Sequence, residues 1–269
     1  MLLPFALLLA LAATASAITI IAPVSTQIDD GAQISIGDVG PGQTFIVSAE
    51  PKVASGGRYD LGGAYDQLSA SSLPSGWVSS PSRLYSAPLQ ADVTVPKGAA
   101  DGQYTVEFTM WDEAGEQGLG RNVSFKALVN VRHDIMDMKV EPSSLSVGAG
   151  QPARYTITVV NKGIANDVFT VGSSGVRNLE FRRSVYIPSG TSKTLSYEVV
   201  VETESDYWVK IWSKSSSSDS ISSEQDVTLR VNTDLFSDYR AVNRGVLLFP
   251  LTQAPLYFVT GLLSNLLPS

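Results

Sequence analysis

The chain of 269 residues contains no cysteine and a single histidine, His133. The lack of cysteine excludes disulfides, thiol nucleophiles, thiolate-bound zinc and attachment of a lipid to a cysteine. An exported chain of this length must therefore be stabilised by packed apolar cores. Its hydrophobic content of 43% is sufficient for such cores.

Positive charge is also scarce. Lysine and arginine number 19 against 26 aspartates and glutamates, which gives a net charge of −7. No basic run is longer than Arg182-Arg183. Because phosphate backbones are bound by clustered basic side chains, nucleic acid is excluded as the expected partner.

Both ends of the chain are apolar and almost free of charge. Residues 1–17 contain an apolar run that ends in Ala15-Ser16-Ala17, the pattern of a cleaved signal peptide, although no lysine or arginine precedes the run. An uncleaved anchor or a buried N-terminal segment is the alternative. The run is shorter than the roughly 20 apolar residues that span a bilayer. We therefore expect an exported protein located at the cell surface.

The other apolar end, residues 245–269, carries no charge and follows a predicted short amphipathic helix over residues 234–244. Pro250 and Pro255 divide this tail, and a helix that begins near Pro255 would be about 20 Å long, against a hydrocarbon core of about 30 Å. Small and polar residues form one strip of that helix, which permits close contact with a partner helix: Thr260, Gly261, Ser264 and Asn265. We expect the tail to associate with the membrane or with a membrane-protein partner. Three alternatives stay open: docking into a neighbouring subunit, packing on the tail's own sandwich, and removal as a sorting segment.

The region between the two ends alternates apolar and polar residues with the period of a β-strand, clearly so over residues 104–111, 123–131, 155–160 and 193–201. The pattern recurs after about 100 residues, so that Tyr104 matches Tyr207 and Val131 matches Val231. About seven short strands in each 100 residues predict an all-β fold of two tandem Ig-like antiparallel β-sandwiches. The predicted domains cover residues 18–132, with an insertion at 56–82, and residues 139–232.

Each unit resembles the CARDB-like and alpha-galactosidase-associated Ig-like modules of archaeal and bacterial cell-surface proteins. The second unit carries this resemblance in TITVVNKG, in IPSGTSKTLSYEV and in a late Tyr-x-Val-x-Ile strand, and the first carries it in GQTFIVSAEP and VPKGAADGQYTVEF. The resemblance implies a non-catalytic role in adhesion, spacing or assembly, through protein–protein contacts of the Ig-like domains.

Residues that could carry chemistry are few. A Ser-His-Asp triad would require His133, which lies in the predicted joint between the domains, and no Gly-x-Ser-x-Gly elbow is present. An acidic group in a predicted hairpin loop is the only candidate for a metal, and we expect it to be solvated rather than to bind calcium: Asp112, Glu113 and Glu116. The sequence therefore predicts neither an enzyme nor a cofactor.

Aromatic side chains offer the alternative of carbohydrate binding. Trp77 is predicted to be exposed in the insertion, where Tyr59 and Tyr65 would accompany it as glycan contacts. Trp208 and Trp212 lie an even number of residues apart on one strand, so they share a face, which we predict to be buried.

Two further features of the sequence are expected at the surface. The serine-rich segment 213–223 is predicted to be a flexible hairpin tip, and Asn122-Val123-Ser124 is an N-glycosylation sequon. The combined prediction is a non-catalytic, structural or adhesive surface subunit, or an accessory subunit, that presents two Ig-like modules outside the membrane. The alternatives are a carbohydrate-binding accessory module and a self-assembling filament or layer subunit that uses the apolar tail.

Overall fold

The computed structural model describes residues 17–113, 115, 118–119, 122–176 and 180–232. Within these ranges the chain is all-β, and its regular elements are strands apart from one short 3-10 helix, Arg58–Asp60 (η1). No helix in this described part is long and apolar enough to cross a membrane. The predicted signal peptide (except for Ala17), the helix over 234–244 and the apolar tail, with its strip from Thr260 to Asn265, lie outside the described residues.

The first half of the chain forms two main sheets and one small strand pair. The first sheet has the order β2-β1-β4-β9-β8, the second has the order β3-β11-β10-β7, and β5 pairs with β6. The strands are Ile18–Ala22 (β1), Thr26–Ile28 (β2), Gln33–Val39 (β3), Thr44–Ala49 (β4), Lys52–Val53 (β5), Gly63–Ala64 (β6), Gln67–Ser72 (β7), Val78–Ser80 (β8), Leu89–Thr94 (β9), Gly102–Trp111 (β10) and Val123–Val131 (β11).

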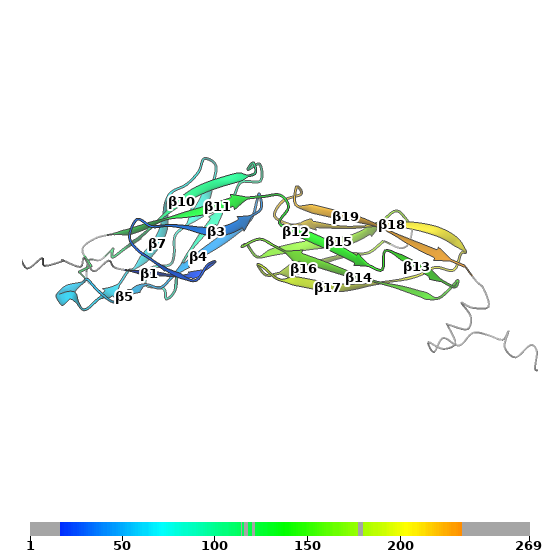
Figure 1. Cartoon of the computed structure of the whole chain (residues 1–269), viewed down its shortest axis with the longest axis horizontal. Helices are drawn as coiled ribbons and strands as arrows, with labels where there is room; N and C mark the ends of the chain where they lie inside the picture. Colours follow the sequence, from blue (N-terminus) through cyan, green and yellow to red (C-terminus); the bar gives the residue numbers. More distant parts are fainter. Residues whose placement is uncertain (1–16, 114, 116–117, 120–121, 177–179, 233–269) are drawn as a thin grey trace, which may run out of the picture.

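The second half repeats this arrangement with fewer strands. Its three-stranded sheet has the order β12-β14-β17, and its five-stranded sheet has the order β13-β19-β18-β15-β16. The strands are Met136–Glu141 (β12), Ser144–Val147 (β13), Pro152–Asn161 (β14), Asp167–Ser174 (β15), Arg182–Ile187 (β16), Ser192–Val200 (β17), Ser205–Ser215 (β18) and Ser222–Val231 (β19). Figure 1 shows the sheets of the two halves following one another along the long axis of the molecule.

The sheets are not purely antiparallel, contrary to the prediction. Each half contains one parallel pair, β3 with β11 and β13 with β19. The cause is topological. After β1 and β2 the chain crosses to the other sheet and forms β3, which runs in the same direction as β11, the last strand of the first half. After β12 it crosses in the same way and forms β13, which runs in the same direction as β19. Alternation along a single strand reports the pleat but not the direction of its neighbour.

Each half has its own apolar core because the alternating residues of its two sheets face one another. The core of the first half contains the stacked pair Phe108 and Phe125, whose ring centroids are 5.3 Å apart. The core of the second half contains Tyr155, whose ring centroid lies 6.1 Å from that of Tyr197. Burial therefore follows the period of two predicted from the sequence.

The predicted repeat has a structural counterpart at the start of β10 and β18. The hydroxyl of Tyr104 donates a hydrogen bond of 3.0 Å to the carbonyl of Ala100. The hydroxyl of Tyr207 donates a bond of the same length to the carbonyl of Thr203. Each tyrosine thus fastens its own strand to the residue four positions earlier, so the two residues are equivalent.

Part of the predicted insertion at 56–82 belongs to the main sheet. Strand β7 pairs with β10 as β15 pairs with β18, and Leu68 is fully buried. The extra material is instead the short excursion formed by β5, η1 and β6. Gly and Ser are frequent around β7, and this composition weakened its strand signal in the sequence.

Candidate functional surfaces

In the second half, the outer face of the sheet β13-β19-β18-β15-β16 presents two tryptophans, contrary to the prediction that they are buried. Trp208 is 66% exposed, and Trp212 is partly buried. They do share one face of β18, as expected, but Val209 and Ile211 of the same strand fill the core. The sequence contained a signal for this orientation, because Lys210 has the same parity as the two tryptophans and a lysine is almost never fully buried.

Trp212 lies across its sheet rather than projecting from it. A Cβ atom added to Gly172, the register partner of Trp212 on β15, would lie 2.5 Å from the indole. On the next strand, the guanidinium carbon of Arg182 lies 5.9 Å from the indole centroid. The ring is therefore supported by a glycine beneath it and by a cation–π contact beside it.

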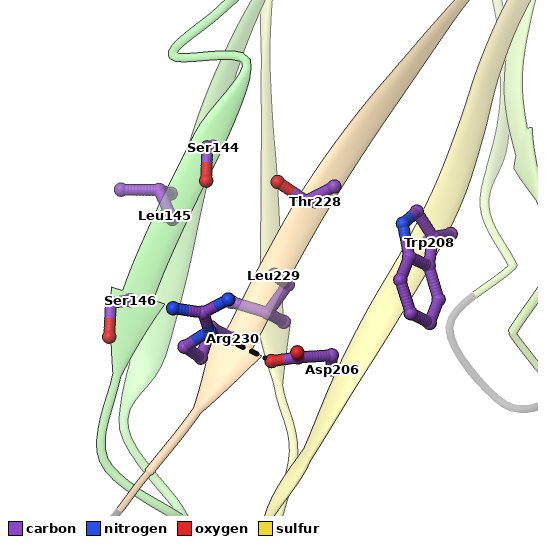
Figure 2. Close-up of a pocket in the computed structure, with 8 residues that line it drawn as sticks. All are labelled: Ser144, Leu145, Ser146, Asp206, Trp208, Thr228, Leu229 and Arg230. Carbon is purple, nitrogen blue, oxygen red and sulfur yellow. Dashed lines mark hydrogen bonds and ion pairs between the residues drawn. The ribbon is translucent and has the colours of Figure 1, made fainter.

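Trp208 borders a groove of about 250 Å³ on the same face (Figure 2). In register beside it lie Thr228 on β19 and Ser144 on β13. One end of the groove is bounded by an ion pair in which Arg230 Nε donates to Asp206 Oδ1 at 3.0 Å. An exposed ring thus stands next to hydroxyls and a charged pair.

The second prominent surface is the junction between the two halves, where three glycines of the first half meet the second. A Cβ atom added to Gly37 would lie 2.6 Å from Ile164 Cγ2. One added to Gly40 would collide with Ile221 and Ile135, and one added to Gly42 with the backbone carbonyl of Ser217. Gly42 also has φ +76, a conformation that favours glycine. The turn Gly40-Pro41-Gly42 is therefore also a close contact surface.

A buried carboxylate stands at the centre of this junction. Asp167 is 4% exposed, and its Oδ2 accepts hydrogen bonds from Gln43 Nε2 at 2.7 Å and from Ser215 Oγ at 2.6 Å. Its Oδ1 accepts from Ser217 Oγ at 2.9 Å and from the amide of Val168 at 2.7 Å. The side chain of Gln43, which is fully buried, also accepts a bond from the amide of Gly40. Desolvation of a carboxylate is costly unless its oxygens are hydrogen-bonded, and both oxygens are hydrogen-bonded here.

Part of the serine-rich segment 213–223, which was predicted to be a flexible hairpin tip, is therefore packed in the structure. It does form the β18–β19 hairpin, but Ser213, Ser215 and Ser218 are buried. At the end of this hairpin, which meets the first half of the chain, small serine side chains supply hydrogen-bond donors and still allow close packing.

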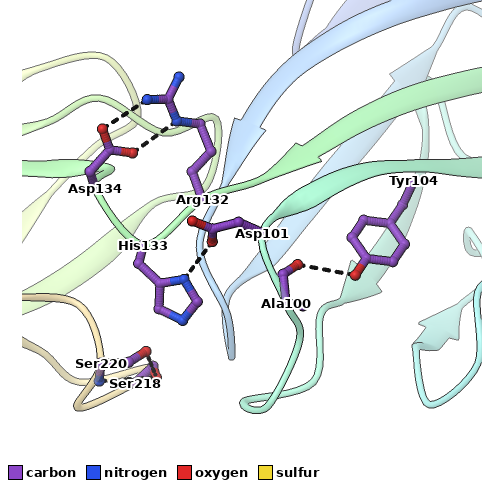
Figure 3. Close-up of polar contacts among 8 residues, drawn as sticks. All are labelled: Ala100, Asp101, Tyr104, Arg132, His133, Asp134, Ser218 and Ser220. Atoms are coloured by element: carbon purple, nitrogen blue, oxygen red, sulfur yellow. Dashed lines mark hydrogen bonds and ion pairs between the residues drawn. The ribbon is translucent and has the colours of Figure 1, made fainter.

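The segment that connects the two halves is exposed and rich in ion pairs (Figure 3). His133 Nδ1 lies 2.5 Å from Asp101 Oδ1, so the only histidine of the chain occupies the surface of the connection, as predicted. Arg132 donates two bonds of 2.8 Å to Asp134. These bonds hold the pKa of the Asp134 carboxyl below its usual value.

The acidic group considered for a metal is only partly described. Asp112 lies just after β10, and its carboxylate oxygens are shielded from solvent without a hydrogen-bond partner among the described residues. Glu113 is exposed, and Glu116 lies outside the described residues. No group of three potential ligands occurs within the described ranges.

The aromatic residues predicted as glycan contacts do not share a surface. Trp77 is 7% exposed, so its predicted exposure is wrong. Its ring centroid lies 6.4 Å from that of Phe45 and 5.4 Å from that of Tyr104. Tyr65 is 3% exposed, whereas Tyr59 is 88% exposed. Trp77 is buried because it closes the core beside the tyrosine that starts β10.

The sequon asparagine, Asn122, is exposed immediately before β11. Its glycosylation stays a prediction.

Neither a protein-family model nor a curated protein matches the chain. Among solved structures, a β-glucosidase from Listeria innocua is 15% identical with a TM-score of 0.25, covering 36% of this chain and 16% of its own length. A CARDB domain from Pyrococcus furiosus, in complex with di-metal ions, is 16% identical with a TM-score of 0.27, covering 35% of this chain and 86% of that domain. A chimeric titin Z1Z2 is 14% identical with a TM-score of 0.34, covering 82% and 99%. Likenesses this partial identify neither a family nor an activity.

Proposed function

We propose that the chain is an exported, non-catalytic surface subunit that presents two Ig-like β-sandwiches as one rigid pair outside the membrane. The observation that carries this proposal is the buried hydrogen bond between Gln43 and Asp167, which joins the two halves. A connection made only of an exposed linker would leave two modules free to swing. A fully satisfied polar contact inside a glycine-lined interface favours one fixed arrangement instead.

Further support for the Ig-like assignment comes from the paired tyrosines. Tyr104 and Tyr207 each bond to a carbonyl a few residues upstream at the start of a late strand, which is the arrangement called the tyrosine corner in Ig-like sandwiches. The proposed domains are residues 18–132 and 139–232. The apolar tail 245–269 would hold this pair at the membrane or on a membrane-protein partner.

Rigidity can be tested with pairs of spin labels, since the chain has no native cysteine to interfere. Lys126→Cys and Lys193→Cys place one label on an exposed position of each half. A narrow distance distribution supports the proposal, and Gly42→Ala should broaden it, because the new methyl would meet the carbonyl of Ser217. Gly98→Ala is the matched control, since an added Cβ there meets nothing within 4 Å. A broad distribution in the unsubstituted protein would overturn the rigid-pair proposal.

Attachment is tested separately by fractionation. Full-length protein should remain in carbonate-washed membranes, while a version truncated after Asn232 should not. Large soluble assemblies that truncation abolishes would instead identify a filament or layer subunit and contradict the membrane-associated role.

A further inference from the structure

The most informative surface outside the junction is the outer face of the sheet β13-β19-β18-β15-β16 in the second half. Its outward side chains are those that alternate with the core residues on each strand. They are Ser144, Ser146, Val168, Thr170, Ser174, Arg182, Ser184, Tyr186, Asp206, Trp208, Lys210, Trp212, Lys214, Ser222, Glu224, Asp226, Thr228 and Arg230.

The large exposed apolar side chains of this face are aromatic. Of the three large exposed hydrophobic side chains on the described strands of the second half, Trp208 and Tyr186 lie on this face, and Val200 lies on the other sheet. A protein-binding patch normally has a centre depleted of charged side chains, whereas the exposed Lys210 lies between the two tryptophans on this face of β18. Separate rings surrounded by hydroxyls and charged pairs are the surface that stacks on the C–H face of a sugar ring and hydrogen-bonds its hydroxyls.

Charge on this face is nearly balanced, with four basic and three acidic side chains in the set above. The charges are also paired across strands, Arg230 with Asp206 and Lys210 Nζ with Glu224 at 2.9 Å. Both pairs leave a weak net field, which does not select a polyanion such as nucleic acid or a sulfated glycan. The ligand that matches the face is therefore neutral.

The spacing of the two rings indicates the size of that ligand. Trp208 and Trp212 are four residues apart on one strand, which corresponds to roughly 13 Å. Trp208 borders the groove of about 250 Å³, and Trp212 borders a second, larger groove that also includes Arg182. The first groove is smaller than the roughly 300–1,000 Å³ of a typical site for a drug-sized molecule, so it suits a single sugar unit. An oligosaccharide can reach both rings, whereas one monosaccharide cannot.

The first half supplies an internal control for this argument. Because Tyr104 is equivalent to Tyr207, Thr105 of β10 corresponds to Trp208, and Thr109 corresponds to Trp212. The same fold is thus built with threonines at both positions. The two tryptophans are not required to form this type of sheet.

We propose that the outer face of β13, β19, β18, β15 and β16 binds a neutral oligosaccharide, with Trp208 as the principal stacking residue and Trp212 as the second. Asp206 and Arg230 hydrogen-bond hydroxyls of the sugar unit on Trp208, and Thr228 and Ser144 border the same groove. This binding site is additional to the proposed structural role and uses neither the junction nor the tail.

Native affinity electrophoresis of the full chain tests the proposal. The gels contain laminarin, glucomannan, α-mannan or arabinoxylan as neutral probes and dextran sulfate as the charged probe. At least one neutral probe should retard the protein, and Trp208→Thr should weaken the retardation roughly tenfold or more, as for loss of a central aromatic contact. Tyr85→Ala is the matched control, because it removes a ring that is 69% exposed but lies in the other half.

Four outcomes would overturn the proposal. They are no retardation by any neutral probe, retardation by dextran sulfate alone, retardation that Trp208→Thr leaves unchanged, and self-association without sugar binding that Trp208→Thr abolishes. The circular dichroism spectrum of Trp208→Thr should match that of the unsubstituted protein, because the ring is 66% exposed. A lost fold in this variant would show that the tryptophan is structural and would also contradict the proposal.

Discussion

Strands β10 and β18 carry equivalent tyrosines near their starts but differ at two matched positions of their outer faces. In β10 these positions are Thr105 and Thr109, and Thr109 Oγ1 donates to Ser71 Oγ at 2.9 Å on the neighbouring strand. In β18 they are Trp208 and Trp212, and Trp212 lies over Gly172. Both strands bury apolar side chains in their cores, such as Phe108 in β10 and Ile211 in β18. The comparison teaches that the core specifies the fold, while the outer face is free to diverge.

The two halves also differ in how aromatic rings fill their cores. In the first core, Phe108 stacks on Phe125. In the second core, Tyr155 stacks on Tyr197, and the hydroxyl of Tyr155 donates a hydrogen bond of 3.0 Å to the carbonyl of Thr228 on the opposite sheet. Burial raises the pKa of Tyr155 to about 12. The second core therefore contains a buried aromatic hydroxyl whose titration is strongly displaced.

The largest expected effect comes from emptying the core of the first half. Phe108→Ala should lower the free energy of unfolding by about 3–5 kcal/mol, because it removes a fully buried ring and leaves a cavity. Urea unfolding can be followed by the fluorescence of Trp77 and Trp111, and separately by that of Trp208 and Trp212 after paired replacements. The rigid-pair proposal predicts that the second half also becomes less stable. If its transition stays in place, the two halves unfold independently and the junction contributes no coupling.

A smaller loss should follow removal of the carboxylate in the junction. Asp167→Ala leaves Gln43 and two serine hydroxyls without their acceptor, at an expected cost of about 1–3 kcal/mol. Asp226→Ala, which removes an exposed carboxylate from the same half, is the control and should change stability by less than about 0.5 kcal/mol. Equal effects of the two substitutions would show that the buried network does not stabilise the junction.

The buried tyrosine predicts an alkaline weakness in the second half. A tyrosine in the unfolded chain ionises near pH 10. The folded pKa of Tyr155 is raised to about 12, so its contribution is complete below pH 10 and is lost as the pH rises toward 12. Tyr155→Phe should cost about 1 kcal/mol at neutral pH through the lost hydrogen bond. It should also flatten the decline in the unfolding midpoint between pH 10 and 12. An unchanged slope in this variant would assign the alkaline decline to other groups.

The smallest effect tests the comparison of outer faces directly. Trp208→Thr gives β18 the residue found at the equivalent position of β10, and it should change the free energy of unfolding by no more than about 0.5 kcal/mol. The exchange in the other direction, Thr105→Trp, should be tolerated equally because Thr105 is exposed. Thermal unfolding measures both. A loss of several kcal/mol from Trp208→Thr would mean that the outer aromatic residue supports the sheet, and the division between core and outer face would fail.

Much of the fold followed from the alternation of residues. The strands near 104–111, 123–131, 155–160 and 193–201 were predicted close to their observed positions, and the equivalence of Tyr104 and Tyr207 is confirmed by their matching hydrogen bonds. Strand β7 was missed because its composition resembles a loop. The parallel pairs were missed because the direction of a neighbouring strand is a long-range property.

The functional surfaces were harder to predict. Trp77 was expected at the surface and is buried, while Trp208 was expected in the core and is exposed. Hydrophobicity ranks both residues alike, so it cannot decide between two faces of a strand. The charged neighbours of Trp208 with the same parity, above all Lys210, were the informative signal.

The sequence by itself determined an all-β chain with a period of about 100 residues and apolar, uncharged ends, because a strand records its burial in a period of two. It also excluded chemistry that depends on cysteine. Only the tertiary structure decided that Gln43 meets Asp167, 124 residues away, and that the tryptophans of β18 face outward. These features depend on which surfaces approach one another when the sheets close, and no local pattern of residues records that approach.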